Sequence, residues 1–269
     1  MNRESGFVSV GCRDCRQARP LQIEFSMAFQ PIVDVASCTV FGYEALVRGL
    51  KGEGAGAILG QVDDTNRYRF DQACRVKAID LAARLELEGM LSINFLPNAV
   101  YRPETCIRAT LEAAAEHRFP TERIMFEVTE GERISDHAHL RNILSAYKEL
   151  GFVTAIDDFG AGYSGLNLLA EFQPHVIKLD MALTRNIHQD RVRRAIVFAI
   201  LSACRELGVR VIAEGIESFE ECLTLADQGV ELFQGYYFAQ PAFEALPQLS
   251  DETWAMLERR AGGLRRHYG

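Results

Sequence analysis

The chain has 269 residues, of which 48% are hydrophobic and 25% are charged, and its formal net charge at pH 7 is -8. This is the composition of an ordinary globular protein, and its acidic balance argues against nonspecific binding to nucleic acid. The length fits one α/β barrel, which takes about 250 residues.

The cysteines and the N-terminal residues bear on the compartment. Seven cysteines, an odd number, are scattered along the chain, which is typical of a reducing cytoplasm and not of a disulfide framework. Residues 1–15 lack the apolar core of a signal peptide. The most apolar helical stretch, residues 195–204, is far shorter than the ~20 residues that span a bilayer. We therefore expect a soluble cytoplasmic protein that has neither DNA nor a membrane as its partner.

Residues 1–22 are expected to form an N-terminal tail, because they show no sustained hydrophobic period. Cys12 and Cys15 form a single Cys-x-x-Cys pair in this tail. A structural zinc site needs four ligands, and no second pair at matching spacing follows. Inert thiols are the simpler interpretation, and zinc or redox chemistry is the alternative.

From Phe25 onward, short apolar runs alternate with segments of helical periodicity. Strands are predicted at residues 25–34, 39–49, 90–96, 123–130, 153–157, 176–180, 209–217 and 231–238. Helices are predicted at about 69–88, 105–116, 140–150, 191–207, 218–229 and 249–258. This alternation indicates parallel βαβ units.

Three helices carry local signals. Leu140, Ile143, Leu144, Tyr147 and Leu150 mark one helix face, and Gly151 follows as the residue that ends the helix. Ser218 and Glu221 have the spacing of a capping box. The apolar residues that the helix at 191–207 is expected to bury are Val192, Ala195, Ile196, Ala199, Ile200 and Ala203.

About eight strands in this length favour a closed α/β barrel of the TIM-like (β/α)8 type over an open doubly wound sheet, which is the alternative. We expect this barrel to occupy residues 23–260 as one domain, followed by a C-terminal tail at 261–269. No independent second domain is predicted.

The stretch from Thr154 to Asp180 has charge at the end of each of its two strands. Asp157 and Asp158 are adjacent at the end of the first strand, and Lys178 and Asp180 close the second. Buried parallel strands are normally continuous apolar runs, so these ionisable groups need a reason. In the simpler alternative, Asp158 caps the next helix and Asp157 is a solvated loop residue.

Similar residues end the other strands. In an α/β barrel the active site lies at the C-terminal ends of the strands. Those ends carry Glu44, Asn94, Glu127, Asp157, Asp158, Lys178, Asp180, Glu214 and Gln234. Clustered carboxylates raise each other's pKa, and divalent cations compensate this repulsion. Oxygen ligands suit Mg²⁺ or Mn²⁺, and the absence of His and Cys from this rim argues against zinc.

The adjacent Asp157 and Asp158 are placed to bridge two metals, the usual arrangement for phosphodiester cleavage. Lys178 and Arg48 add the positive charge that a phosphate ligand needs. The alternative for Lys178 is a lysine whose amine reaches out to solvent, or a structural lysine.

Seven motifs resemble a known family, in order and spacing. They are EALVRG at 44–49, SINF at 92–95, FEVTE at 126–130, DDFGAGYSG at 157–165, VIKLD at 176–180, AEGIE at 213–217 and QGYYF at 234–238. Over about residues 25–241 the chain resembles the EAL-domain cyclic-di-GMP phosphodiesterases, bacterial second-messenger enzymes.

The resemblance implies a TIM-like barrel with one antiparallel strand, and hydrolysis of cyclic di-GMP to linear pGpG. It also implies two Mg²⁺ or Mn²⁺ ions. The implied ligands are Glu44, Asn94, Glu127 and Asp157 for one metal, and Asp157 and Asp158 for the other.

The resemblance further implies roles for the remaining site residues. Lys178 would hold a metal-bound water, and Glu214 matches the family's proposed general base. Two side chains would support metal-bound waters, Glu217 and Gln234. Two would contact the dinucleotide, Arg48 and Gln30, and Asp180 would contact a guanine. Glu130 matches the glutamate that braces the DDFG loop, which lies near the family's usual dimer contact, so a homodimer is expected.

The chain departs from the family pattern at Ala161 and Gly165, where Thr and Ser are common, and these changes add backbone freedom to the loop. All the matching metal ligands are present. An active phosphodiesterase is therefore the main hypothesis. The alternative is a catalytically silent receptor that binds cyclic di-GMP and acts through a protein partner.

Overall fold

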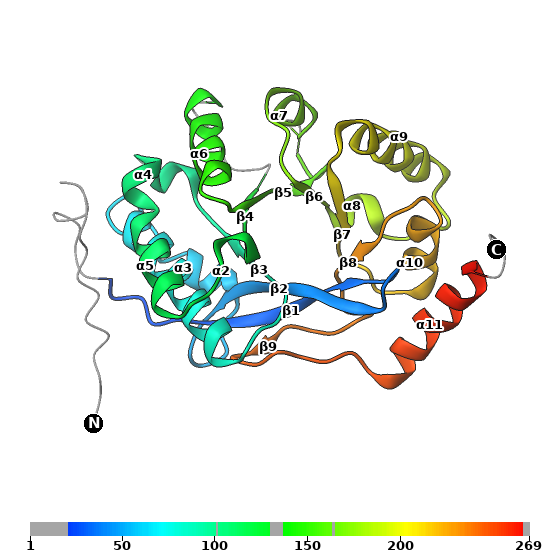
Figure 1. Ribbon diagram of the computed structural model, residues 1–269, viewed down its shortest axis with the longest axis horizontal. Helices are drawn as coiled ribbons and strands as arrows, with labels where there is room; N and C mark the ends of the chain where they lie inside the picture. The colour runs from blue at the N-terminus through cyan, green and yellow to red at the C-terminus, as the bar shows by residue number, and fades with distance from the viewer. Residues whose placement is uncertain (1–20, 101, 130–136, 163–164, 266–269) are drawn as a thin grey trace.

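The computed structural model describes residues 21–100, 102–129, 137–162 and 165–265 (Figure 1). The main sheet consists of β1 (Ser26–Asp34), β2 (Thr39–Arg48), β3 (Met90–Asn94), β4 (Ile124–Thr129), β5 (Val153–Phe159), β6 (Val176–Leu179), β7 (Arg210–Ala213), β8 (Leu232–Phe233) and β9 (Ala242–Phe243). Neighbouring strands from β2 to β8 are parallel in chain order, and β1 joins β8 back to β2. The strands therefore close into an eight-stranded barrel, with β9 attached to β1 outside the ring.

The direction of β1 is the irregular feature of the ring. This strand pairs antiparallel with both of its neighbours in the barrel, β2 and β8. The turn at residues 35–38 makes β1 and β2 a hairpin, so no crossover helix separates them. The predicted TIM-like barrel with one antiparallel strand is confirmed, and the open sheet is excluded.

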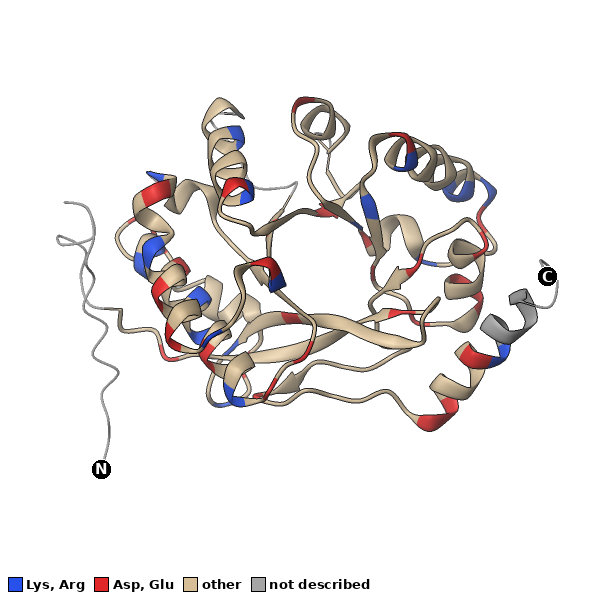
Figure 2. Ribbon diagram, viewed as in Figure 1, with Lys and Arg blue, Asp and Glu red and all other residues tan. Residues whose placement is uncertain are grey.

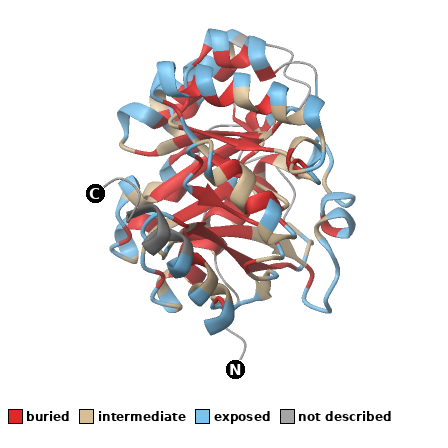
Figure 3. Ribbon diagram, turned by 90° about the vertical axis from the view of Figure 1, so that its right-hand side faces the viewer, coloured by how far each residue is buried: buried red, intermediate tan, exposed pale blue. Residues whose placement is uncertain are grey.

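Helices surround the barrel (Figures 1 and 3). They are α2 (Ala55–Leu59), α3 (Arg67–Arg84), α4 (Pro103–Cys106), α5 (Arg108–Glu116), α6 (His137–Glu149), α7 (Gly165–Glu171), α8 (Met181–Thr184), α9 (Arg191–Leu207), α10 (Phe219–Ala226) and α11 (Asp251–Arg265), with single 3-10 turns η1 (Pro97–Ala99) and η2 (Thr121–Arg123). Among the described residues, no helix has the length and apolar character needed to cross a lipid bilayer.

Local signals located one end of each of two helices correctly. Ser218 and Glu221 form the predicted capping box at the start of α10, with both reciprocal hydrogen bonds present. Gly151 follows α6 with φ of +88°, a conformation that favours glycine. Helix α3 ends at Arg84 and not near residue 88, because the chain turns at Glu86, which has φ of +54°.

The predicted buried face of α9 is wrong except at Ile200. Val192 and Ile196 are 68% and 47% exposed, whereas the residues that α9 buries are Val197, Ile200, Leu201 and Cys204. Apolar residues occur on more than one side of this helix, so its periodicity fits two overlapping faces. Contact with the barrel selects one of them and leaves an apolar face uncovered.

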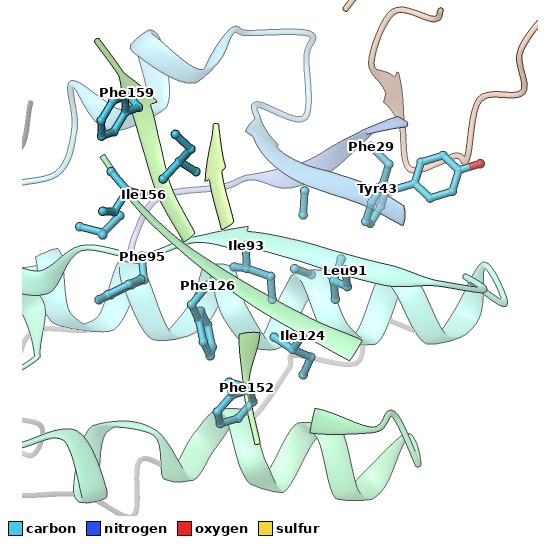
Figure 4. Packing of buried hydrophobic residues seen from close by; sticks show 14 of the residues in the cluster. Phe29, Tyr43, Leu91, Ile93, Phe95, Ile124, Phe126, Phe152, Ile156 and Phe159 are labelled. Carbon is cyan, nitrogen blue, oxygen red and sulfur yellow. The ribbon is translucent and has the colours of Figure 1, made fainter. Parts of the chain in front are cut away.

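Two hydrophobic cores stabilise the fold. The larger one lies between the barrel and the helices, and Figure 4 shows Phe95, Phe126 and Phe152 within it. The rings of these three residues and of Tyr147 pack with centroids 5.0–6.0 Å apart. The smaller core fills the barrel interior with Ile32, Met125, Ala155, Val176, Ile212 and Leu232. This interior layer closes one end of the barrel and forms the floor beneath the polar site.

Candidate active site

A simple register places the polar side chains above the interior floor. Successive residues of a strand point to opposite faces, so residues two apart share a face. The pairs of floor residue and polar residue two positions later are Met125 and Glu127, Ala155 and Asp157, Val176 and Lys178, Ile212 and Glu214, and Leu232 and Gln234. Gln30 precedes Ile32 by two positions because β1 runs in the opposite direction. The strands thus build one polar layer at the C-terminal rim, and Figure 2 shows acidic residues on the strands of the ring.

Lys178 stands at the centre of this layer. Its Nζ lies 2.7 Å from Oε1 of Glu214, 2.8 Å from Oε2 of Glu127, 3.2 Å from Oδ1 of Asp157 and 3.3 Å from Oε2 of Glu44. The lysine side chain is only 1% exposed. It is therefore a buried counter-charge to four carboxylates and does not reach out to solvent.

The electrostatics of the cluster show an excess of negative charge. Burial raises the pKa of Glu127 and of Glu214 well above the ordinary value, and the nearby Lys178 charge offsets this only in part. Burial by itself would lower the pKa of Lys178, but the surrounding carboxylates outweigh it and raise that pKa well above its usual value. One ammonium cannot neutralise four carboxylates, so the site favours additional cations.

Asp157 and Asp158 both belong to the site because β5 is irregular at this point. The pairing of β5 with β6 shifts between Ile156 and Phe159, and Asp158 has φ of +52°. The backbone amide of Asp158 donates a hydrogen bond to Oδ1 of Asp157 at 2.9 Å. Burial, followed by the charges of Asp157 and Asp180, raises the pKa of Asp158 to about 6. Because α7 begins only at Gly165, Asp158 is not the cap of that helix.

The carboxylates form two groups that fit divalent cations. Oxygens of Glu44, Glu127 and Asp157 lie within 4.8 Å of one another, and so do oxygens of Asp157, Asp158 and Glu214. Asp157 belongs to both groups, so it has the position of a bridging ligand. Hard oxygen donors of this kind suit Mg²⁺, Mn²⁺ or Ca²⁺.

Amide side chains complete the rim beside Glu44. Nδ2 of Asn94 donates to Oε1 of Glu44 at 2.8 Å, which leaves the amide oxygen of Asn94 for a cation. Nε2 of Gln234 donates to Oε2 of Glu44 at 2.7 Å and to Oε1 of Gln30 at 3.2 Å. Gln30 in turn donates to the carbonyl of Ala239 at 3.2 Å.

The other predicted site residues lie further out or elsewhere. The carboxylate of Glu217 is 50% exposed and is paired with Arg185, whose NH2 lies 2.6 Å from Oε1. Asp180 caps α8 by accepting the amide of Ala182 at 2.8 Å. The guanidinium of Arg48 donates to the carbonyl of Val47 at 2.8 Å. Glu130 lies outside the described residues.

Sequence reasoning did not identify two residues of this region. Ser92 donates from its hydroxyl to Oε1 of Glu127 on the neighbouring strand. It lies two positions before Asn94, so the alternation of β3 could have indicated it. Arg185 follows α8 and pairs with Glu217, and no sequence pattern connects these two positions.

Two adjoining cavities meet at the carboxylates. One has a volume of about 430 Å³ and apolar walls that include Leu46, Phe70 and Phe95. The other has a volume of about 310 Å³ and is lined by more polar residues, including Gln30, Asp180, Met181, Arg185, Gln234 and Tyr236. Both are lined by Glu44, Asp158 and Glu214, so the acidic cluster separates two lobes of one groove.

Solved structures resemble this fold closely. A standalone EAL protein from Vibrio cholerae O395, in a c-di-GMP bound form, is 57% identical, with a TM-score of 0.84 and coverage of 87% of this chain and 98% of that one. BlrP1 from Klebsiella pneumoniae, in a manganese and cy-diGMP complex, is 36% identical, with a TM-score of 0.79 and coverage of 87% and 59%.

Curated proteins also resemble this chain in sequence. The Escherichia coli blue light- and temperature-regulated antirepressor BluF is 34% identical over 224 residues, which cover 83% of this chain and 56% of BluF. The cyclic di-GMP phosphodiesterase RocR of Pseudomonas aeruginosa is 36% identical over 126 residues, covering 47% of this chain and 32% of RocR. The chain spans about half or less of the length of the curated relatives that it matches.

The EAL domain family matches residues 13–241, which is most of the chain and contains every strand of the closed barrel. The match includes the five carboxylates and the lysine of the polar layer. The chain therefore belongs to the EAL-domain family, which includes cyclic-di-GMP phosphodiesterases.

Proposed function

We propose that this protein hydrolyses cyclic di-GMP to linear pGpG with two divalent cations, Mg²⁺ or Mn²⁺. The observation that carries the proposal is the pair of carboxylate groups that share Asp157. Two adjacent cations are the usual means of phosphodiester cleavage, and one relative with the same fold, BlrP1, is described in a complex with manganese and cyclic di-GMP. When bound, the cations lower the pKa of the attacking water and offset negative charge on the phosphate.

The proposed ligands come from four strands and their ends. Glu44, Asn94, Glu127 and Asp157 would hold one cation, while Asp157 and Asp158 would hold the other. Glu214 lies with the second group, so it is placed either to bind that cation or to accept the proton of the attacking water. Lys178 would orient this water and, together with the cations, favour the ionised form of its carboxylate neighbours.

The two-lobed groove suits a ligand with two bases on either side of a phosphate. The apolar lobe offers surfaces such as Phe70 for a purine ring. In the polar lobe, Gln30 and Gln234 are placed to contact the dinucleotide, and Asp180 to accept from a guanine. Arg48 would attract the dinucleotide by its positive charge, and Glu217 would hold waters that are bound to the cations.

We also propose that the protein forms a homodimer through the exposed face of α9. Val192 and Ile196 lie one turn apart on this face and are both strongly exposed. In a two-fold dimer the same patch meets itself, which an apolar helix face satisfies without charge complementarity. Replacing Ile196 with Glu should then convert a dimer into a monomer in sedimentation experiments. A wild-type protein that sediments as a monomer would refute this assembly.

The test of the enzymatic proposal is direct. Purified protein is incubated with cyclic di-GMP and Mg²⁺, Mn²⁺, Ca²⁺ or excess chelator, and the products are separated by chromatography. We expect pGpG with Mg²⁺ or Mn²⁺, no product with chelator, and little with Ca²⁺, whose longer bonds and looser geometry misplace the water. A rate with excess chelator equal to the rate with Mg²⁺ or Mn²⁺ would refute the two-cation mechanism.

The alternative function is a receptor that binds cyclic di-GMP without cleaving it. One relative, BluF, is described as an antirepressor and not as an enzyme. The complete set of carboxylates in this chain favours hydrolysis. Binding of cyclic di-GMP by calorimetry, with no product formed in Mg²⁺ or Mn²⁺, would decide for the receptor.

A further inference from the structure

A buried ion pair lies beneath the rim, outside the carboxylate cluster. Asp71 and Arg75 stand one turn apart on α3, and NH2 of Arg75 lies 2.5 Å from Oδ2 of Asp71. Their side chains are 3% and 0% exposed. Removing two charges from water costs several kcal/mol per ion, so such pairs stabilise a fold weakly or not at all compared with apolar residues. This pair therefore calls for an explanation other than stability.

Both partners contact the residues that directly follow Asn94. Oδ1 of Asp71 accepts a hydrogen bond from the backbone amide of Leu96 at 2.8 Å. The guanidinium carbon of Arg75 lies 5.5 Å from the centre of the Phe95 ring. The ion pair thus holds the backbone and the side chain of the turn where β3 ends.

Aromatic residues hold Arg75 in place from the other sides. Its NH1 donates to the hydroxyl of Tyr147 at 2.9 Å. The rings of Phe126 and Tyr147 lie 5.2 and 5.7 Å from its guanidinium carbon. Since Phe126 belongs to β4 and Tyr147 to α6, Arg75 ties the turn to two rigid elements of the fold.

Asn94 depends on this turn for its position. It is the last residue of β3 and is exposed toward the rim, where its amide contacts Glu44. Two hydrogen bonds fix the backbone after Asn94. The amide of Phe95 donates to the carbonyl of Glu127 in β4 at 3.0 Å, and the amide of Leu96 donates to Asp71. Without the bond to Asp71, of these two only the bond to β4 would hold the turn.

We propose that Asp71 is a positioning residue that fixes Asn94 as a cation ligand by accepting the amide of Leu96, with Arg75 as the buried counter-ion of Asp71. The proposal rests on the cation site of the proposed function. Asp71 lines the apolar lobe of the groove, but both of its oxygens are engaged by Leu96 and Arg75. Its role is therefore to hold the turn rather than to contact a substrate.

The experiment compares two double variants that both remove the buried charges. Asp71→Leu with Arg75→Met removes the acceptor of the Leu96 amide. Asp71→Asn with Arg75→Met keeps a neutral acceptor at the same place. Neither leaves an unpaired buried charge, which is the main cause of unfolding when one partner alone is removed. Mn²⁺ affinity is measured without substrate by electron paramagnetic resonance, and kcat and KM are measured separately.

We expect the Leu and Met variant to bind Mn²⁺ about 10–100-fold more weakly, the usual effect of losing a group that orients a metal ligand. The Asn and Met variant should bind within about threefold of the wild type, since its acceptor remains. A matched control is Asp34→Asn, because Asp34 also accepts backbone amides, from Ala36 and Ser37, at the opposite end of the barrel. This control should leave the affinity unchanged.

Equal Mn²⁺ affinities for both folded double variants and the wild type would overturn the positioning role. If the variant Asp71→Leu with Arg75→Met fails to fold, the variant Asp71→Asn with Arg75→Met still tests the proposal. Weak Mn²⁺ binding by that variant, which retains the acceptor for the Leu96 amide, would contradict the proposal. A wild type that binds Mn²⁺ but releases no pGpG would refute the proposed hydrolysis and leave the positioning role intact.

Discussion

Nζ of Lys178 lies 2.8 Å from Oε2 of Glu127, and neither side chain is more than 1% exposed. Such a pair is costly to bury unless each charge has further partners. Here the lysine has three more carboxylates, and Glu127 accepts a second hydrogen bond from the hydroxyl of Ser92. Lys178 is thus the one cation that the described part of the chain places inside the cluster.

The first prediction concerns this lysine. Lys178→Met keeps much of the side-chain volume but leaves four carboxylates without their ammonium, so the metal-free protein should lose stability. The stabilisation by saturating Mn²⁺ should be larger than in the wild type, because cations then provide all the compensation. Hydrolysis should fall at least about a hundredfold, or about 2.7 kcal/mol in barrier.

Chemical unfolding with and without Mn²⁺, together with the hydrolysis rate, tests this prediction. Lys148→Met is the control, since the Lys148 amine donates to an exposed carbonyl, that of Gln173, and lies over the ring of Phe172. Equal stabilisation by Mn²⁺ in wild type and Lys178→Met would contradict the view that lysine and cations share one role.

The second prediction separates catalysis from binding. Asp157→Asn preserves shape but removes the charge of the only carboxylate that belongs to both cation groups. The attacking water should then keep a pKa closer to its bulk value of about 15.7. We expect a rate loss on the order of a thousandfold, about 4 kcal/mol, with a much smaller loss of cyclic di-GMP affinity.

Hydrolysis and ligand binding are measured at saturating Mg²⁺ for wild type, Asp157→Asn and Asp34→Asn. The last variant changes an aspartate at the opposite end of the barrel and should retain the wild-type rate. Near-normal hydrolysis by Asp157→Asn would show that no bridging carboxylate is needed.

The third prediction concerns pH. The pKa of Asp158 is about 6 in the fold, against an ordinary value of 3.8, so the folded metal-free protein binds this proton more tightly than the unfolded chain. Protonated Asp158 therefore contributes to the stability of the fold. This contribution is fully present below pH 3.8 and is lost as the pH rises through 6. Asp158→Asn lacks this titration and, as Asn, tolerates the positive φ.

The free energy of unfolding is therefore measured with chelator between pH 4 and 7 for both proteins. The wild type should lose stability relative to Asp158→Asn as the pH increases across this range. A constant difference between the two proteins would mean that Asp158 has no raised pKa in the fold.

The fourth prediction concerns the turn after Glu214. Gly215 has φ of +63°, and an added Cβ would lie 2.4 Å from Cβ of Met181. Gly208 has φ of +67° with open space around it, so Gly208→Ala measures the cost of backbone strain alone. Gly215→Ala should lower the melting temperature more and also reduce hydrolysis, because the displaced turn carries Glu214. Equal effects of the two substitutions on both measurements would contradict this.

The sequence was sufficient to predict the barrel because the hydrophobic pattern of each strand or helix can be recognised from that segment alone. Strand ends such as those before Asp180 and Glu214 follow from apolar runs that a charged residue terminates, and parallel topology then brings these ends to one rim. The capping box at Ser218 is equally local. The buried face of α9 was not predictable, because α9 carries apolar residues on more than one of its sides. Only contact with the barrel distinguishes the buried Val197 from the exposed Ile196.

The site was predictable in its composition but not in its arrangement. Nothing local indicates that Lys178 touches four carboxylates, since their distances depend on the register of five strands. The joint position of Asp157 and Asp158 depends on an irregularity between β5 and β6. Likewise, the pairing of Glu217 with Arg185 is made by two loops that are distant in sequence.

The reversed first strand has a consequence for synthesis of the chain. One edge of β1 is paired by β2 as soon as the hairpin forms, but its other edge waits for β8 and β9. Gln30 and Gln234, which meet across that junction, are 204 positions apart. At 5–20 residues per second this takes a ribosome ~10–40 s. During that time the nascent protein exposes an apolar strand edge of the kind that pairs with other chains. The completion of residues 232–243 therefore ends the period in which this protein is most prone to aggregate.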